Sequence, residues 1–238
     1  MLILALDTTG GSAGAALWQD GHLLIETILQ RGLTHSETLM PLINDLYCQV
    51  DRDPASTRGL ACTTGPGSFT GIRIGISTVL GMAYSLNCPV IGYSTLAVLA
   101  RPWRWQKDAL IIPSLDARNQ RVYAGVWSGQ DLIIEENNWA AAELSAELIR
   151  VLAEETDRPL ILCGSGQDVL SGQLPASLAV RQMSDEQGLP RPSVIAQWAE
   201  EDMTDEMCQT PQATWPLLQP RYLGRSQAER RRDQRAME

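Results

Sequence analysis

The stretch on which the fold depends reads Cys62-Thr63-Thr64-Gly65-Pro66-Gly67-Ser68-Phe69-Thr70-Gly71-Ile72-Arg73-Ile74-Gly75. It joins a short apolar run to a helical pattern, and its glycines permit a turn whose backbone could approach a ligand closely. Ser68 or Thr70 can cap the helix, whose N-terminus would attract anions. The stretch is not a Walker A motif, because Ile72 stands where that motif has lysine. Two interpretations stay open: a phosphate cradle and a tight strand-to-helix connection.

The composition is that of a folded globular protein with an uneven charge. The chain has 238 residues, of which 44% are hydrophobic and 20% charged, enough for one or two domains. A net charge of -9 argues against a surface that binds nucleic acid or anionic membranes throughout. Residues 221–238, however, hold six arginines against three carboxylates. This segment is either a frayed terminus or an arm that touches RNA.

Cysteine spacing and the N-terminus indicate the compartment. The five cysteines are far apart, form no CxxC motif and stand mostly in apolar runs, which is typical of buried free thiols in a reducing cytosol. The first apolar run has no basic flank and meets Asp7 after six residues, so it is neither a signal peptide nor a membrane span. We therefore expect a soluble cytoplasmic protein with no membrane partner.

The first hundred residues predict alternating strands and helices. A buried strand is followed by a hairpin through Asp20-Gly21, then by a helix that starts at a Thr34-x-x-Glu37 capping box and contains Pro41. The predicted elements are strands 2–6, 13–19 and 22–29, helix 34–50, strand 59–63, helix 68–86 and strand 90–92. This order fits a ribonuclease H-like unit.

The second half of the chain resembles the first. Leu115-Asp116 repeats Leu6-Asp7 at an offset of 109 residues, and the same offset pairs Ala15 with Ala124. The predicted elements are strands 109–115, 121–128 and 131–136, helix 143–155, strand 159–163 and helix 193–202. The polar segment 101–108, with interleaved Arg and Trp, either covers a subdomain boundary or stacks nucleotides.

We therefore predict an α/β fold of two ribonuclease H-like subdomains. The first comprises residues 1–104 and is completed by 215–228, the second comprises 105–214, and 229–238 form a frayed tail. In such a fold the strand ends converge on the cleft between the halves, where turns and carboxylates would hold a nucleotide and its metal. The residues of this vestigial nucleotide cleft are Asp7, Thr8, Thr9, Gly65, Gly67, Ser68, Asp116, Arg118 and Gly164.

The cleft lacks what catalysis would need. Ala117 and Arg118 stand in the second turn where glycine and hydroxyl residues are wanted, so ATP binding by this chain alone is not expected. Only two histidines are present, and Leu39 follows His35 at the spacing where a second histidine ligand could stand. With no G-x-S-x-G elbow either, we predict no metal site and no catalytic residues.

Several motifs together resemble the TsaB (YeaZ) family. They are Leu6-Asp7-Thr8-Thr9, Thr34-His35-Ser36-Glu37, the Gly65 to Gly75 stretch, Leu115-Asp116-Ala117-Arg118 with Val122-Tyr123, and Pro220-Arg221-Tyr222-Leu223. The resemblance implies a duplicated domain of the actin, hexokinase and heat-shock-protein type. It also implies a non-catalytic partner of TsaD, the subunit that transfers threonylcarbamoyl to an adenosine of tRNA.

The resemblance further implies the partners and the interface. It predicts a scaffold that stabilises a TsaD-like subunit, a TsaE-like ATPase that joins the complex, a homodimer in isolation, tRNA contact only through the complex, and ATP or ADP and metal held by the partner subunits. The two N-terminal helices would form the interface, through His35, Leu39, Leu42, Ile43, Leu46, Gly71, Ile72, Gly75, Ile76 and Val79. The alternative is an autonomous ATP-dependent kinase or metallopeptidase of the same fold.

Overall fold

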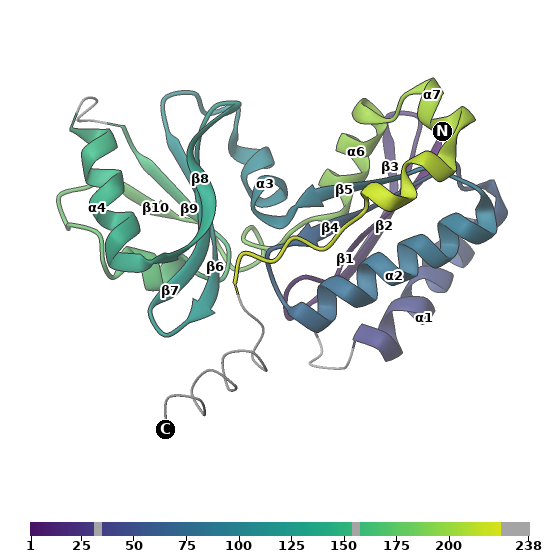
Figure 1. The fold of residues 1–238 in the computed structure, drawn as a ribbon, viewed down its shortest axis with the longest axis horizontal. Helices are drawn as coiled ribbons and strands as arrows, with labels where there is room; N and C mark the ends of the chain where they lie inside the picture. Colours follow the sequence, from purple (N-terminus) through teal and green to yellow (C-terminus); the bar gives the residue numbers. More distant parts are fainter. Residues whose placement is uncertain (31–34, 154–157, 225–238) are drawn as a thin grey trace.

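The computed structural model describes residues 1–30, 35–153 and 158–224, which form two halves side by side (Figure 1). Each half is built on a five-stranded sheet. The strand order is β3-β2-β1-β4-β5 in the first half and, read in the matching direction, β8-β7-β6-β9-β10 in the second. The two orders are the same when each half is numbered from its own first strand, so the predicted duplicated ribonuclease H-like α/β fold is confirmed.

The first sheet is covered on both faces. It comprises β1 (Leu2–Asp7), β2 (Ala13–Gln19), β3 (His22–Leu29), β4 (Gly59–Gly65) and β5 (Val90–Ser94). Strand β1 is continuously apolar up to Asp7 because it lies in the centre of the sheet, antiparallel to β2 and parallel to β4. Its alternate residues Leu2, Leu4 and Leu6 belong to one core cluster, and Ile3 and Ala5 belong to another.

Two helices cover one face of this sheet. They are α1 (His35–Gln49), with Pro41 inside it, and α2 (Phe69–Leu86), which Ser68 caps by accepting a hydrogen bond from the Gly71 N–H. The capping box predicted at Thr34 lies outside the described residues. By length and composition α2 alone among the described helices could cross a membrane. One such helix is weak evidence for a span, since helices that pack on a protein core have the same character.

The second sheet repeats the pattern with shorter helices. It comprises β6 (Leu110–Arg118), β7 (Arg121–Ser128), β8 (Asp131–Ala140), β9 (Leu160–Cys163) and β10 (Val180–Gln182), with helices α4 (Ala141–Leu152) and α5 (Gln167–Ser171). The pairing differs from the first half by one residue. Leu6 lies opposite Ala15, but Leu115 lies opposite Tyr123 and not Ala124. The offset of 109 therefore does not hold from β6 into β7.

The C-terminal region returns to the first half earlier than predicted. Helix α6 (Pro192–Asp202) packs Ile195, Ala196 and Ala199 against Ile3 and Ala5, on the face of the first sheet opposite α1 and α2 (Figure 1). The second subdomain therefore ends before α6 and not at residue 214. The next helix, α7 (Asp205–Gln209), follows on the same side, and the chain then crosses back to the junction.

The segment between the halves departs in part from expectation. Helix α3 (Thr95–Ala100) and residues 101–108 connect β5 to β6. Trp103 packs against the core cluster at this junction, whereas Trp105 is 74% exposed and covers nothing there.

The prediction of buried cysteines holds for three of the five. Cys62, Cys88 and Cys163 are buried, while Cys48 and Cys208 are exposed. Burial raises the pKa of the Cys88 thiol to about 11 and that of the Cys163 thiol to about 12. These two thiols therefore stay protonated at neutral pH.

Candidate functional site

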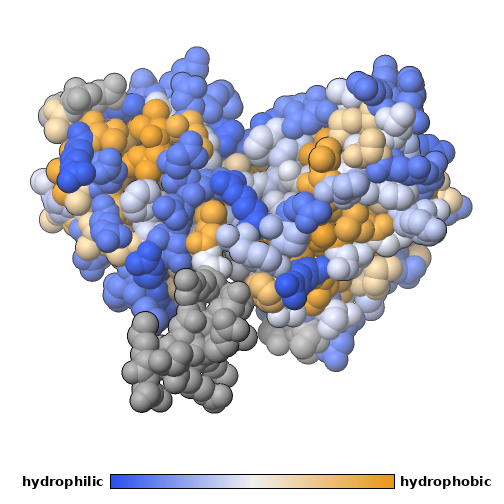
Figure 2. Space-filling model, in the orientation of Figure 1, coloured by the Kyte–Doolittle hydropathy of each residue, from blue (hydrophilic) through white to orange (hydrophobic). Residues whose placement is uncertain are grey.

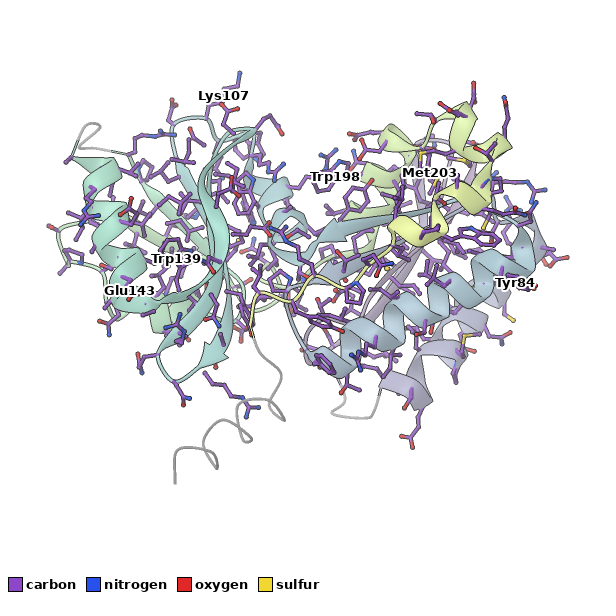
Figure 3. The ribbon with its side chains drawn as sticks, in the orientation of Figure 1. Tyr84, Lys107, Trp139, Glu143, Trp198 and Met203 are labelled. Carbon is purple, nitrogen blue, oxygen red and sulfur yellow. The ribbon has the colours of Figure 1, made fainter. Side chains whose placement is uncertain are left out.

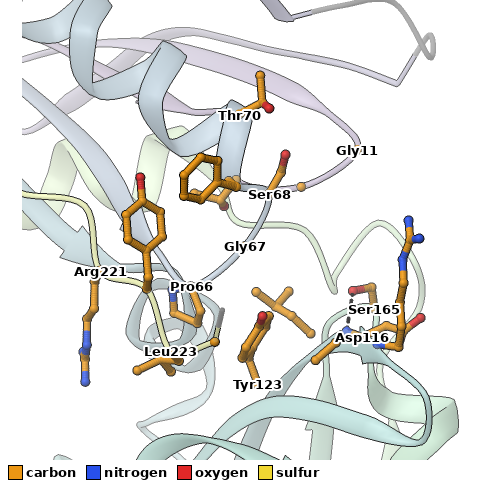
Figure 4. A pocket seen from close by; sticks show the side chains of 18 residues that line it. Gly11, Pro66, Gly67, Ser68, Thr70, Asp116, Tyr123, Ser165, Arg221 and Leu223 are labelled. Atoms are coloured by element: carbon orange, nitrogen blue, oxygen red, sulfur yellow. Dashed lines mark hydrogen bonds between the residues drawn. The ribbon is translucent and has the colours of Figure 1, made fainter. Parts of the chain in front are cut away.

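A cleft of about 600 Å³ lies between the two halves (Figure 4). Its walls are the turn after β1, the loop from β4 into α2, the end of β6 and the chain at residues 221–224. Of the nine predicted cleft residues, Thr9, Gly67, Ser68, Asp116 and Arg118 line it. The other four lie behind the wall, and their roles are structural.

The loop before α2 requires its glycines because other backbone segments press against it. Gly65 and Gly67 have φ values of +113° and +156°. A β-carbon at Gly65 would overlap the carbonyl oxygen of Arg221, and one at Gly67 would overlap that of Thr9. The Ser68 N–H donates to the Thr9 carbonyl at 2.7 Å, which fixes the two turns together. The glycines thus serve close packing within the chain.

Asp7, a carboxylate predicted to face the cleft, is buried beneath these turns. Its side chain is 1% exposed. Its Oδ1 accepts hydrogen bonds from the hydroxyls of Thr63, at 2.5 Å, and Thr9, at 2.6 Å. Burial raises the pKa of Asp7, opposed by these hydrogen bonds and by the nearby His35. Asp7 therefore holds β1, β4 and the Thr9 turn together and does not face the cleft.

The second turn, at Asp116 and Arg118, forms hydrogen bonds within the second half. The Asp116 carboxylate accepts from the Arg118 N–H at 2.7 Å, and the Asp116 N–H donates to Ser165 Oγ at 3.2 Å. In the third turn Gly164 has φ +98°, and a β-carbon at Gly166 would lie 2.9 Å from the carbonyl carbon of Leu115. The two carboxylates therefore differ, since Asp7 is buried whereas Asp116 is exposed and lines the cleft.

An aromatic and arginine cluster, which we call the cleft mouth, was not predicted from the sequence. It consists of Phe69, Arg73 and Tyr222. The rings of Phe69 and Tyr222 stack with centroids 4.8 Å apart, and the guanidinium of Arg73 lies 3.9 Å from the Phe69 centroid. Arg73 Nε also donates to the Tyr222 hydroxyl at 3.0 Å. Phe69 and Tyr222 stay 37% and 40% exposed, so the cluster is accessible. The two segments that form it had appeared in the sequence only as family motifs.

A buried carboxylate joins the halves beside the cleft. Glu136 on β8 accepts a hydrogen bond from Ser94 Oγ, at the end of β5, at 2.6 Å. It also forms an ion pair of 2.6 Å with Arg221, whose backbone N–H donates to the Thr64 carbonyl. Burial raises the pKa of Glu136, against the opposing effects of Ser94 and Arg221. This network fastens both halves to the C-terminal segment.

The structure contradicts the expected availability of the interface residues. Leu39, Leu42, Ile43, Leu46, Ile72, Ile76 and Val79 all lie in the core of the first half. His35 Nε2 donates to the Gly10 carbonyl at 3.0 Å. A β-carbon at Gly71 would overlap the Thr8 carbonyl, and one at Gly75 would lie 2.5 Å from Thr8 Oγ1. These two glycines therefore accommodate Thr8, in the turn after β1, and not a partner helix.

A different set of residues forms the outer surface of the two helices. We call it the α1–α2 face; it comprises Met40, Asn44 and Cys48 on α1 and Ser77, Gly81 and Tyr84 on α2, all exposed. A β-carbon at Gly81 would meet nothing within 4 Å. Tyr84 is 78% exposed at the end of α2 away from the junction (Figure 3). Figure 2 shows apolar surface on this half and a further apolar area on the other half.

Potential metal ligands do not converge in the part of the chain that the structure describes. No group of three or more His, Cys, Asp or Glu side chains there could hold an ion. His22 Nδ1 donates to the Asp20 carbonyl of its own hairpin at 2.8 Å.

The fold and cleft define a two-lobed protein of the duplicated ribonuclease H-like class, and comparisons identify its family. Residues 30–230 match the family described as TsaD, tRNA N6-adenosine threonylcarbamoyltransferase. The tRNA threonylcarbamoyladenosine biosynthesis protein TsaB of Bacillus subtilis is 31% identical, over 82% of this chain and 86% of that protein. Its counterpart in Escherichia coli is 30% identical, over 70% and 72%.

The solved structures agree on the fold. YeaZ from Pseudomonas aeruginosa superposes with a TM-score of 0.73 at 24% identity, covering 93% of this chain and 99% of that one. The chain belongs to the TsaB family, within the broader TsaD family.

Proposed function

We propose that this chain takes part in the synthesis of threonylcarbamoyladenosine on tRNA as a non-catalytic subunit. In this role it binds and stabilises a TsaD-like transferase through the α1–α2 face. A TsaE-like ATPase joins the complex, and nucleotide and metal belong to the partner subunits. In the absence of a partner the same face pairs two copies of the chain.

The state of the cleft supports the non-catalytic part of the proposal. Asp7 is buried and already accepts two hydroxyl hydrogen bonds, so it cannot reach a metal ion without opening the turns that cover it. Asp116 is bound to its own hairpin, and Arg118 stands in place of a small residue. Asp7 is therefore not arranged as a metal ligand or as a general base.

The main support for docking through the α1–α2 face is the exposed glycine Gly81 in the middle of α2. A glycine inside a helix costs about 1 kcal/mol relative to alanine. The cost at Gly71 and Gly75 has a reason within the chain, because Thr8 lies against both glycines. Gly81 has no such reason, since a β-carbon there would meet nothing within 4 Å. Close approach of another helix would account for it.

The test is co-purification with the TsaD-like subunit of the same organism. A β-carbon at Gly81 meets no atom of its own chain, so Gly81→Arg should abolish co-purification while the isolated protein melts no lower than the wild type. Ala146→Arg places the same side chain on the exposed side of α4 and serves as the matched control. Retention of Gly81→Arg at the level of the control would exclude this face as the interface.

A further inference from the structure

The buried carboxylate of Glu136 has two arginines near it at the junction of the halves. One is Arg221, whose Nη1 lies 2.6 Å from Glu136 Oε2. This ion pair does not have hydrogen-bond geometry, so Oε2 is buried without a hydrogen-bond partner among the described residues. The other is Arg104, in the segment that connects α3 to β6. Glu136 thus has one arginine as its partner and a second on a different segment.

Arg104 is buried without making full use of its charge. It is 8% exposed, and its Nε has no hydrogen-bond partner in the part of the chain that the structure describes. The carbon of its guanidinium lies 5.3 Å from the ring centroid of Trp127 and 5.6 Å from that of Trp198. Contacts with aromatic rings at such distances offset only part of the cost of burying a cation. Arg104 therefore has unused capacity to pair with an anionic group.

Trp127 brings Arg104 and Glu136 to the same place. A β-carbon at Gly125 would lie 3.0 Å from the Trp127 ring and 3.1 Å from Glu136 Cγ, so these two side chains lie side by side. The two charges also act on each other. Burial lowers the pKa of Arg104 to about 10, and Glu136 opposes this decrease. Burial raises the pKa of Glu136, and Arg104 is among the groups that oppose this increase.

Arg221 belongs to a segment that crosses the junction from one half to the other (Figure 1). We call residues 218–224 the strap. They form neither helix nor strand, and the Arg221 N–H holds the strap to the first half by donating to the Thr64 carbonyl at 2.8 Å. The Arg221 side chain is 44% exposed, whereas that of Glu136 is 2% exposed. A segment with so few backbone hydrogen bonds opens at a lower free energy than the sheets beside it.

We propose that Glu136 exchanges Arg221 for Arg104 when the strap leaves the junction, so that the strap can open without leaving a buried carboxylate unpaired. Removing one partner of a buried ion pair is costly because the remaining charge is left uncompensated. Arg104 supplies the missing charge and therefore makes release of the strap easier. The inference does not depend on the proposed function, because it concerns the junction and not the α1–α2 face.

The test is hydrogen–deuterium exchange of the full chain, followed by mass spectrometry of peptides from the strap and from β1. In the wild type the strap should exchange faster than β1, because it opens locally. Arg104→Met keeps an unbranched apolar side chain against Trp127 and Trp198 and removes the charge. It should slow exchange of the strap about fivefold or more, since opening then leaves Glu136 unpaired. Arg104→Gln should act in the same direction and takes its place if the methionine variant does not fold.

Two controls separate this exchange of partners from a general effect of charge. Arg101→Gln removes an arginine of the same segment that pairs with Glu201, and it should change strap exchange less than about twofold. In a Glu136→Gln background, Arg104→Met should also have less than about a twofold effect, because no carboxylate is left to pair with.

Three results would overturn the proposal. The first is unchanged or faster strap exchange in Arg104→Met, because Arg104 would then not stabilise the open strap. The second is an equal slowing that persists in the Glu136→Gln background or appears with Arg101→Gln. The third is a strap that exchanges no faster than β1 in the wild type, because the strap would then not open on its own.

Discussion

The glycines of α2 differ in what surrounds them, and the difference decides their roles. Gly71 lies against the carbonyl of Thr8, whose hydroxyl in turn donates to the Gly71 carbonyl at 2.7 Å. Gly81 faces open space. The fold requires a glycine at position 71. At position 81 the fold would accept a larger residue, and glycine there lowers the stability of the helix.

Alanine at the two positions should therefore change stability in opposite directions. Gly71→Ala forces β1 and α2 apart and should lower the free energy of unfolding by about 1–3 kcal/mol. Gly81→Ala should raise it by about 0.5–1 kcal/mol, since alanine favours the helix and clashes with nothing. Urea denaturation of the two variants measures both changes. The same sign for both would contradict the assignment of the two glycines.

Helices and strands whose ends are set by local residues could be predicted from the sequence. The positions of elements that depend on packing against distant parts of the chain could not. Helix α2 was predicted almost to the residue because Ser68 caps it and Asn87 ends it in the left-handed conformation. Strand β10, three residues long, carries too little pattern to be recognised. Helix α6 was recognised but assigned to the wrong half, because an amphipathic pattern shows that a face is buried without showing against what.

The candidate site residues were also predicted less well where their surroundings depend on distant parts of the chain. The family resemblance implied an interface through Leu39, Leu42, Ile43 and Leu46 of α1, yet all four are buried inside the first half. Thr9, Gly67, Ser68, Asp116 and Arg118 line the cleft as predicted. Asp7 does not, because it is buried and accepts a hydrogen bond from Thr63 of a different strand. Residues that meet only through the return of the C-terminal segment, such as Phe69 with Tyr222, leave no local signal in the sequence.

At the scale of the whole molecule, the two halves are held at a junction that contains Glu136. Its buried carboxylate receives a hydroxyl from the first half and an arginine from the C-terminal segment. Acidic groups at the end of α6 fasten further elements, since Asp202 accepts from the Tyr93 hydroxyl at 3.0 Å and Glu200 from the Trp18 indole at 2.7 Å. The halves are thus joined by the polar contacts of Glu136 and by the apolar cluster in which α3 packs against β6 and β9.

Glu136 should give the stability of the protein a definite pH dependence. Its pKa in the folded state is raised above the ordinary value of 4.5, so the folded protein binds this proton more tightly than the unfolded chain does. The contribution of Glu136 to stability is greatest below pH 4.5 and falls as the pH rises through the folded-state pKa. Relative to the wild type, Glu136→Gln should therefore gain stability as the pH rises from 4.5.

Thermal denaturation between pH 4.5 and neutrality tests this, with Glu206→Gln, an exposed carboxylate of α7, as the control. The difference between Glu136→Gln and the wild type should grow in favour of the variant, while the control difference stays constant. Parallel curves for wild type and Glu136→Gln would show that Glu136 ionises without a burial penalty.

We propose that this chain acts through the α1–α2 face and not through the cleft between its halves. The most direct measurement is the amount of threonylcarbamoyladenosine in tRNA from cells whose only copy of the gene carries Gly81→Arg or Asp7→Asn. Asparagine keeps a side-chain oxygen to accept from Thr63 and Thr9, so the second variant retains the fold. The account predicts that the modification is lost with Gly81→Arg and preserved with Asp7→Asn. Loss with Asp7→Asn and preservation with Gly81→Arg would contradict it and identify the chain as an enzyme.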